Sequence, residues 1–243
     1  MERHFVHEIE ALKEQLLRMG GRAEAIVLKA VEALRRRDEV LAREVFADDR
    51  QVDQLELDID ARCVGLLALQ QPMAGDLRFI TAALKISNDL ERVGDHAVNI
   101  AGSATRLARE PELQPLMDIT QMAEKSSAML HEALDAFVRR DSDAARRLCL
   151  RDDEVDQLNR QVFRDLLAFI RDDPATAPRA MELILVARNL ERVADLATNV
   201  AEEVVFIAEA RVIKHHAEER QPAAAREGPP RAESPGGDEF SRS

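Results

Sequence analysis

A segment of twelve residues recurs, with some substitutions, 100 positions further along this chain of 243 residues. Residues 90–101 read LERVGDHAVNIA and residues 190–201 read LERVADLATNVA, so eight of the twelve positions are identical. The similarity extends upstream, where ADDRQVDQLE at 47–56 matches LRDDEVDQLN at 150–159. Such a duplication constrains the fold to two similar units in tandem, each of which buries an apolar face against the other.

The prolines divide each unit into segments that we predict to be helical. All nine prolines stand between segments or in the C-terminal region, and proline interrupts the interior of a helix. The segments are rich in Ala, Leu, Glu and Arg and lack the alternating pattern of a strand. Asp38 and Asp141 follow arginines at matching places and are predicted to cap new helices. We expect six helices, over 3–36, 39–70, 76–109, 116–139, 142–171 and 178–214.

The predicted fold is therefore all-α, with two tandem three-helix bundles related by a pseudo-two-fold axis. The first repeat is expected to cover residues 1–110 and the second residues 111–216. Residues 217–243 are a mixture of Pro, Gly, Glu and Arg that cannot bury enough apolar surface to become ordered, so we expect a disordered tail.

Composition excludes several classes of function. The net charge is −12 and the chain has no Trp and no Tyr, so it lacks the cationic surface and the stacking residues of a nucleic-acid-binding protein. No apolar run is long enough for a membrane span, and charged residues occupy the N-terminal positions where a signal peptide would be apolar. We expect a cytoplasmic protein, with Cys63 and Cys149 as reduced core residues because neither belongs to a CxxC motif.

The repeated segments carry carboxylates in matching places. Glu91 and Asp95 are four residues apart and so lie on one face of a helix, roughly 120 to 160° from its apolar stripe. Like charges at this spacing disfavour a helix, and their repetition suggests a compensating cation. Oxygen ligands suit Mg²⁺, Ca²⁺ or Mn²⁺ and can also hold iron. The candidate metal ligands are Glu91, Asp95, Glu191, Asp195, Asp49, Asp53, Asp152 and Asp156.

Three interpretations of these carboxylates remain open at this point. They could form a solvated face on a metal-free helical scaffold, bind a metal cluster, or belong to a metal-dependent enzyme. A ferritin-like di-iron enzyme needs Glu-x-x-His motifs, and none of the six histidines has a Glu three residues before it. The sequence also shows no glycine-rich phosphate loop and no nucleophile elbow. These absences favour a protein that is not an enzyme.

The duplicated plan, with NDLERVGDHAVNIA and RNLERVADLATNVA on the third helix of each unit, resembles the PhoU family of phosphate transport system regulators. The likeness covers roughly residues 1–215, and residues 70–97 form its most specific stretch. The resemblance implies multinuclear metal clusters of iron, zinc, manganese or magnesium bound through repeated E/D-xxx-D motifs at the residues named above. It also implies a protein without enzymatic activity.

The resemblance further implies a cytoplasmic adaptor between the phosphate ABC transporter, through its ATPase subunit, and a phosphate-sensing histidine kinase. Such an adaptor represses the phosphate-starvation response and restrains uptake when phosphate is plentiful. We expect a homodimer that reaches the membrane only indirectly, through its partners. The second repeat has lost much of the QQPMAGDLRFITAALKI stretch of the first, so partner binding is expected to depend mainly on the first repeat.

Overall fold

The structure is a computed structural model that describes residues 2–113 and 116–213. This part of the chain is all-α and contains no strand. None of its helices is long and apolar enough to cross a membrane. Its elements are α1 (Glu2–Arg36), α2 (Glu39–Gln70), α3 (Ala74–Leu107), α4 (Leu116–Arg139), α5 (Ser142–Cys149), α6 (Asp152–Asp172), the 3₁₀ helix η1 (Pro174–Thr176) and α7 (Ala177–Glu209). The tail predicted over 217–243 lies outside the described residues.

The connection between the first two helices of each repeat, α1–α2 and α4–α5, is built in the same way. Arg37 and Arg140 adopt the left-handed conformation, with φ of 57° and 51° respectively, and so end α1 and α4. The next residue then caps the following helix. Asp38 accepts hydrogen bonds from the backbone N–H groups of Val40 and Leu41, and Asp141 accepts one from that of Ala144. The two predicted N-caps are thereby confirmed.

The helix predicted over 142–171 is wrong in one respect, because the chain forms two helices there. The chain leaves α5 after Cys149, turns at Leu150 and Arg151, and begins α6 at Asp152. The first turn of α6 contains Asp152, Asp153 and Glu154, and negative charge is stabilised at a helix N-terminus. The matching stretch of α2 is unbroken. The last helix also ends earlier than the predicted residue 214, at Glu209, because Ala210 is left-handed with φ 57°.

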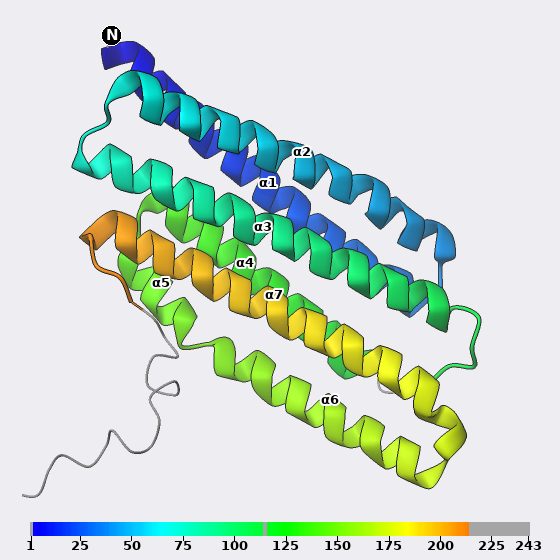
Figure 1. Cartoon of the computed structure of the whole chain (residues 1–243). Coiled ribbons are helices and arrows are strands. Elements are labelled where there is room, and N and C mark those ends of the chain that lie inside the picture. Colours follow the sequence, from blue (N-terminus) through cyan, green and yellow to red (C-terminus); the bar gives the residue numbers. More distant parts are fainter. Residues whose placement is uncertain (1, 114–115, 214–243) are drawn as a thin grey trace, which may run out of the picture. The chain divides into compact units, whose positions relative to one another are not determined.

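Two helical units pack side by side (Figure 1). In the first unit α1, α2 and α3 contact one another. In the second unit α4 and α7 contact each other, and both contact α5 and α6. The units join through the pairs α3–α7 and α1–α4, which leaves α2 and α6 at opposite edges of the assembly (Figure 1). The predicted arrangement of two tandem, duplicated helical bundles is confirmed. In the second bundle, α5 and α6 together occupy the place that α2 has in the first.

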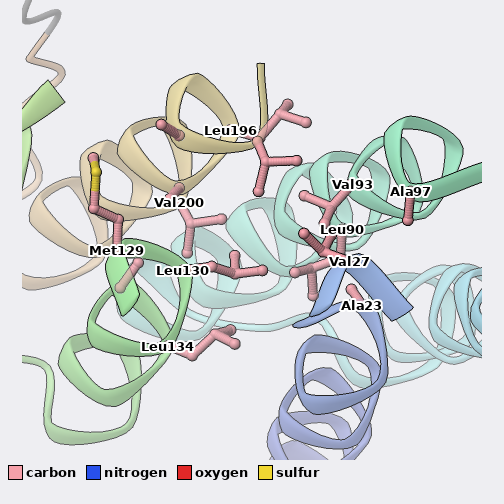
Figure 2. Packing of buried hydrophobic residues seen from close by; sticks show 14 of the residues in the cluster. Ala23, Val27, Leu90, Val93, Ala97, Met129, Leu130, Leu134, Leu196 and Val200 are labelled. Atoms are coloured by element: carbon pink, nitrogen blue, oxygen red, sulfur yellow. The ribbon is translucent and has the colours of Figure 1, made fainter. Parts of the chain in front are cut away.

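A single hydrophobic core runs through both repeats. Figure 2 shows Leu130 of α4 lying between Val200 of α7 and Val27 of α1, with Leu90 of α3 close by. All four side chains are fully buried. Gly20 allows α1 to approach α4, because a Cβ atom there would lie 2.3 Å from Leu134 Cδ1. The two repeats therefore stabilise each other through shared burial of apolar surface.

The two cysteines are buried core residues without a disulfide, as predicted. Burial raises the pKa of the Cys63 thiol to about 12 and that of Cys149 to about 11. Since the thiolate is the reactive form, we expect both thiols to react very slowly with Ellman's reagent at pH 8 in the native protein. Addition of urea should release both at the rate of free cysteine. Rapid labelling of either thiol before unfolding would contradict this prediction.

Candidate functional site

The first carboxylate cluster lies where α2 faces α3. Asp49, Asp53 and Glu56 leave α2 on one side, and Glu91 and Asp95 leave the facing side of α3, close enough to repel one another. The spacings of four and three residues keep each set on one helical face. We call these five residues the first cluster. The structure therefore brings together the four candidate ligands of the first repeat and adds Glu56.

The electrostatics of the first cluster are unfavourable at neutral pH. Burial, followed by repulsion from Asp53 and Asp95, raises the pKa of Asp49 to about 6. Burial, followed by repulsion from Asp95 and Glu56, raises the pKa of Glu91 to about 7. Within the described residues, no member of the cluster forms an ion pair with a lysine or arginine. A cation bound here would relieve the repulsion between these carboxylates.

Gly94 makes room for the deepest carboxylate of this cluster. A Cβ atom at position 94 would lie 2.4 Å from Asp49 Oδ1, so a larger residue would displace that oxygen. Asp49 Oδ1 is buried and has no hydrogen-bond partner among the described residues. A buried oxygen without a partner is costly in a protein interior. This oxygen is suited to ligate a hard cation, and the all-oxygen donor set around it fits the same chemistry.

The second cluster contains Asp152 and Asp156 on α6 with Glu191 and Asp195 on α7. Burial, followed by repulsion from Asp152 and Glu191, raises the pKa of Asp156. Asp152 is 2% exposed and so lies deepest, as Asp49 does in the first repeat. The structure therefore also brings together the four candidate ligands of the second repeat.

Arginines distinguish the two clusters. Arg192 lies 2.7 Å from Asp195, and Arg160 lies 3.7 Å from Asp156. In the first repeat, Leu57 stands in place of Arg160, and Arg92 pairs with Asp89 at 3.4 Å instead of with Asp95. Arginines thus partly neutralise the negative charge of the second cluster, whereas no described arginine does so in the first.

In neither cluster are the carboxylates preorganised around one metal position. In the described part of the chain, no three or more His, Cys, Asp or Glu side chains converge so as to hold one ion. Binding an ion therefore requires the carboxylates to rotate toward it. Most of these carboxylates are partly or fully exposed, and exposed side chains change rotamer readily.

The interface between α3 and α7 contains polar contacts that the sequence alone does not reveal. His96 Nδ1 lies 2.9 Å from Asn189 Oδ1, the geometry of a ring N–H that donates to the amide oxygen. Asn199 donates to Asp89, whose pKa burial raises to about 6. These contacts join the two repeats. The sequence does contain an indirect signal for these contacts, because the two repeats differ at these positions. Asp89 and His96 of the first repeat correspond to Asn189 and Leu196 of the second.

The comparisons with known proteins agree with this architecture. A model of the PhoU domain matches residues 16–104 and again residues 119–204. The chain belongs to the PhoU family. Each of the two PhoU matches contains one complete carboxylate cluster, so both clusters lie within the part of the chain that the family shares.

Curated PhoU proteins cover most of this chain. The phosphate-specific transport system accessory protein PhoU homolog of Aquifex aeolicus is 42% identical over 208 residues, which are 86% of this chain and 94% of the relative. The PhoU protein of Escherichia coli is 32% identical over 211 residues, which are 87% of this chain and 88% of the relative.

Solved PhoU structures have the same fold. The crystal structure of PhoU from Pseudomonas aeruginosa matches with a TM-score of 0.82 and 38% identity, and the match covers 85% of this chain and 100% of that one. The phosphate transport system regulatory protein PhoU from Streptococcus pneumoniae matches with a TM-score of 0.81 and 28% identity, over 86% of this chain and 99% of that one. The all-α duplicated fold is confirmed by these neighbours.

Proposed function

We propose that the protein is a cytoplasmic regulator of phosphate uptake and of the phosphate-starvation response. The observation that carries the proposal is the match of both repeats to the PhoU domain, together with 42% identity to a phosphate transport accessory protein across 86% of the chain. Its partners are then the ATPase subunit of the phosphate ABC transporter and a phosphate-sensing histidine kinase. With phosphate plentiful, the protein holds the kinase in its repressing state and restrains uptake.

An adaptor of this kind acts through its surface and not through a catalytic centre. The long edge helix α2 presents apolar side chains to solvent at Leu57 and Val64, which are 60% and 61% exposed. Exposed apolar residues on a rigid helix support binding to other proteins, including a second copy of this chain in a homodimer. Absence of turnover by the metal-loaded protein on phosphate esters would separate this function from that of a metal-dependent enzyme.

The two carboxylate clusters are proposed to hold multinuclear metal clusters. Asp49, Asp53, Glu91 and Asp95 would ligate ions in the first repeat, and the second cluster would do so in the second. The donor chemistry suits magnesium, manganese or iron, and zinc also accepts carboxylate ligands. A bound cluster would supply positive charge at two faces of an otherwise acidic protein.

Deletion of residues 1–216 in the host tests the regulatory function. Without these residues we expect the phosphate-starvation response to be active in phosphate-rich medium, because the kinase has lost the partner that reports transporter state. A promoter fusion to a phosphate-starvation gene, read in phosphate-rich and phosphate-poor medium, measures the effect.

A chain that ends at residue 216 is the matched control. It keeps both repeats and should restore repression, because every described contact of the fold lies before that point. If the full deletion leaves repression intact in phosphate-rich medium, with no second PhoU gene present, the proposed function is wrong.

A further inference from the structure

A groove of about 380 Å³ runs between α6 and α7 in the second repeat. Arg160 and Arg164 line it from α6, and Arg188 and Arg192 line it from α7. The two arginines of each helix are four residues apart, so their side chains leave the same helical face. Because α6 packs beside α7 (Figure 1), two rows of guanidinium groups border the groove.

This positive charge is local and belongs to one repeat. The whole chain carries a net charge of −12, yet the charged residues that line the groove are these four arginines and Glu191. In the first repeat the positions equivalent to the arginines hold Leu57, Ala61, Asn88 and Arg92. Three of the four guanidinium groups are therefore absent there. The positive charge of the groove is specific to the second repeat and is not a result of the duplication.

Two of the arginines differ from the other two in their ion pairing. Within the described residues, neither Arg164 nor Arg188 forms an ion pair with a carboxylate, and both side chains are exposed. Arg164 donates to Gln161 Oε1 at 2.6 Å, which uses one of its five N–H donors. Like charges along one groove repel each other, and an anion bound between them would relieve that repulsion.

The other two arginines border the second carboxylate cluster. Arg192 contacts Asp195 at 2.7 Å and Arg160 lies 3.7 Å from Asp156, so both also neutralise that cluster. Neutralisation explains why these two arginines are present. It does not explain Arg164 and Arg188, which make no such contact.

We propose that this groove binds an oligophosphate, a chain of linked phosphate groups that is either free or carried by a nucleotide. A guanidinium group matches two phosphate oxygens at once, and two rows of such groups match a linear anion better than a single ion. The volume lies at the lower end of the range for small-molecule sites and exceeds what one orthophosphate needs. Phe163, 46% exposed on the groove wall, offers an apolar surface to an organic part of the ligand.

Calorimetric titration of the full chain tests the proposal. The protein is first freed of metal with a chelator, which is then removed, so that phosphate cannot bind through a metal ion. Tripolyphosphate and ATP are the two probes, orthophosphate tests the need for linked phosphates, and hexaglutamate tests a general preference for anions. We expect tripolyphosphate, ATP or both to bind, and binding of one alone assigns the inorganic or the nucleotide source.

The test variant is Arg164→Gln with Arg188→Gln, which alters neither carboxylate cluster. Loss of two charge-assisted contacts should weaken oligophosphate binding by about tenfold or more. The matched control is Arg43→Gln with Arg50→Gln, two exposed arginines of α2 whose loss changes the net charge equally. The control should keep the wild-type affinity, and circular dichroism should show the same helical content in both variants.

Four results would overturn the proposal. They are no binding of either oligophosphate, equal affinity for orthophosphate, equal affinity for hexaglutamate, and equal loss of affinity in the test and control variants. The titration needs no transporter or kinase, so its failure leaves the proposed regulatory function untouched.

Discussion

The variant Glu91→Ala with Asp95→Ala is expected to lose the metal that we propose for the first repeat while it keeps its helical content. Both side chains lie off the core, Asp95 exposed and Glu91 partly buried, so their removal opens no apolar cavity. Burial, followed by repulsion from neighbouring carboxylates, raises the pKa of Glu91 to about 7, and the double substitution removes both unfavourable effects at this position. The metal-free variant should therefore be as stable as the parent or slightly more so. Metal content by inductively coupled plasma mass spectrometry, with circular dichroism alongside, measures both effects.

A matched control separates ligation from general loss of charge. Glu10→Ala with Glu14→Ala removes two exposed carboxylates at the same spacing on α1, outside both clusters, and should leave metal content unchanged. The variant Glu191→Ala with Asp195→Ala should remove the metal of the second repeat, which we expect to be held less tightly because Arg192 and Arg160 compete for the same carboxylates. Unchanged metal content in both cluster variants would contradict the proposed ligation and would favour the interpretation of these carboxylates as a solvated face.

Replacement of Leu130 by Ala should lower the free energy of unfolding by about 3 kcal/mol, within the usual range for a buried leucine. Leu130 is 0% exposed and lies where α4 meets the first repeat (Figure 2). The variant leaves a cavity at the junction of the two repeats, which rigid helices on both sides cannot fill. Equilibrium unfolding in urea, followed by circular dichroism, measures the change.

Leu69→Ala is the control for this substitution. Leu69 is 79% exposed on α2, so the same loss of atoms removes little buried surface and should change the stability only slightly. A similar loss for both variants would show that Leu130 is not part of a packed junction. A separate unfolding transition for each repeat in the Leu130 variant would show that the junction is what couples them.

The sequence was informative about the helices because the signals that end them are local. Proline positions and the capping residues Asp38 and Asp141 act within one turn, and α2 and α4 begin and end where the sequence predicts. The break between α5 and α6 was missed because neither proline nor glycine marks it. Asp152, the first residue of α6, is buried, and this burial is a tertiary feature that local sequence signals do not reveal.

The sequence predicted most of the carboxylates that belong to the candidate site but not how closely the helices bring them together. Helical spacing places Glu91 above Asp95, and the duplication indicates that the second repeat does the same. The close approach of Asp49 to Gly94 could not be predicted, because it depends on the distance between α2 and α3. The arginine rows of α6 and α7 were also missed, since only packing shows that they border one groove.

The shared core has a consequence for how such a chain could arise. Leu90 of α3 and Leu190 of α7 are equivalent residues, and both are fully buried in the cluster that spans the two repeats. A lone three-helix unit would expose this surface to water, so an ancestor with a single repeat would have been stable only as a pair of identical chains. Fusion of two such chains would make the pair permanent and would leave each copy free to change separately, which is consistent with the arginines that only the second cluster carries.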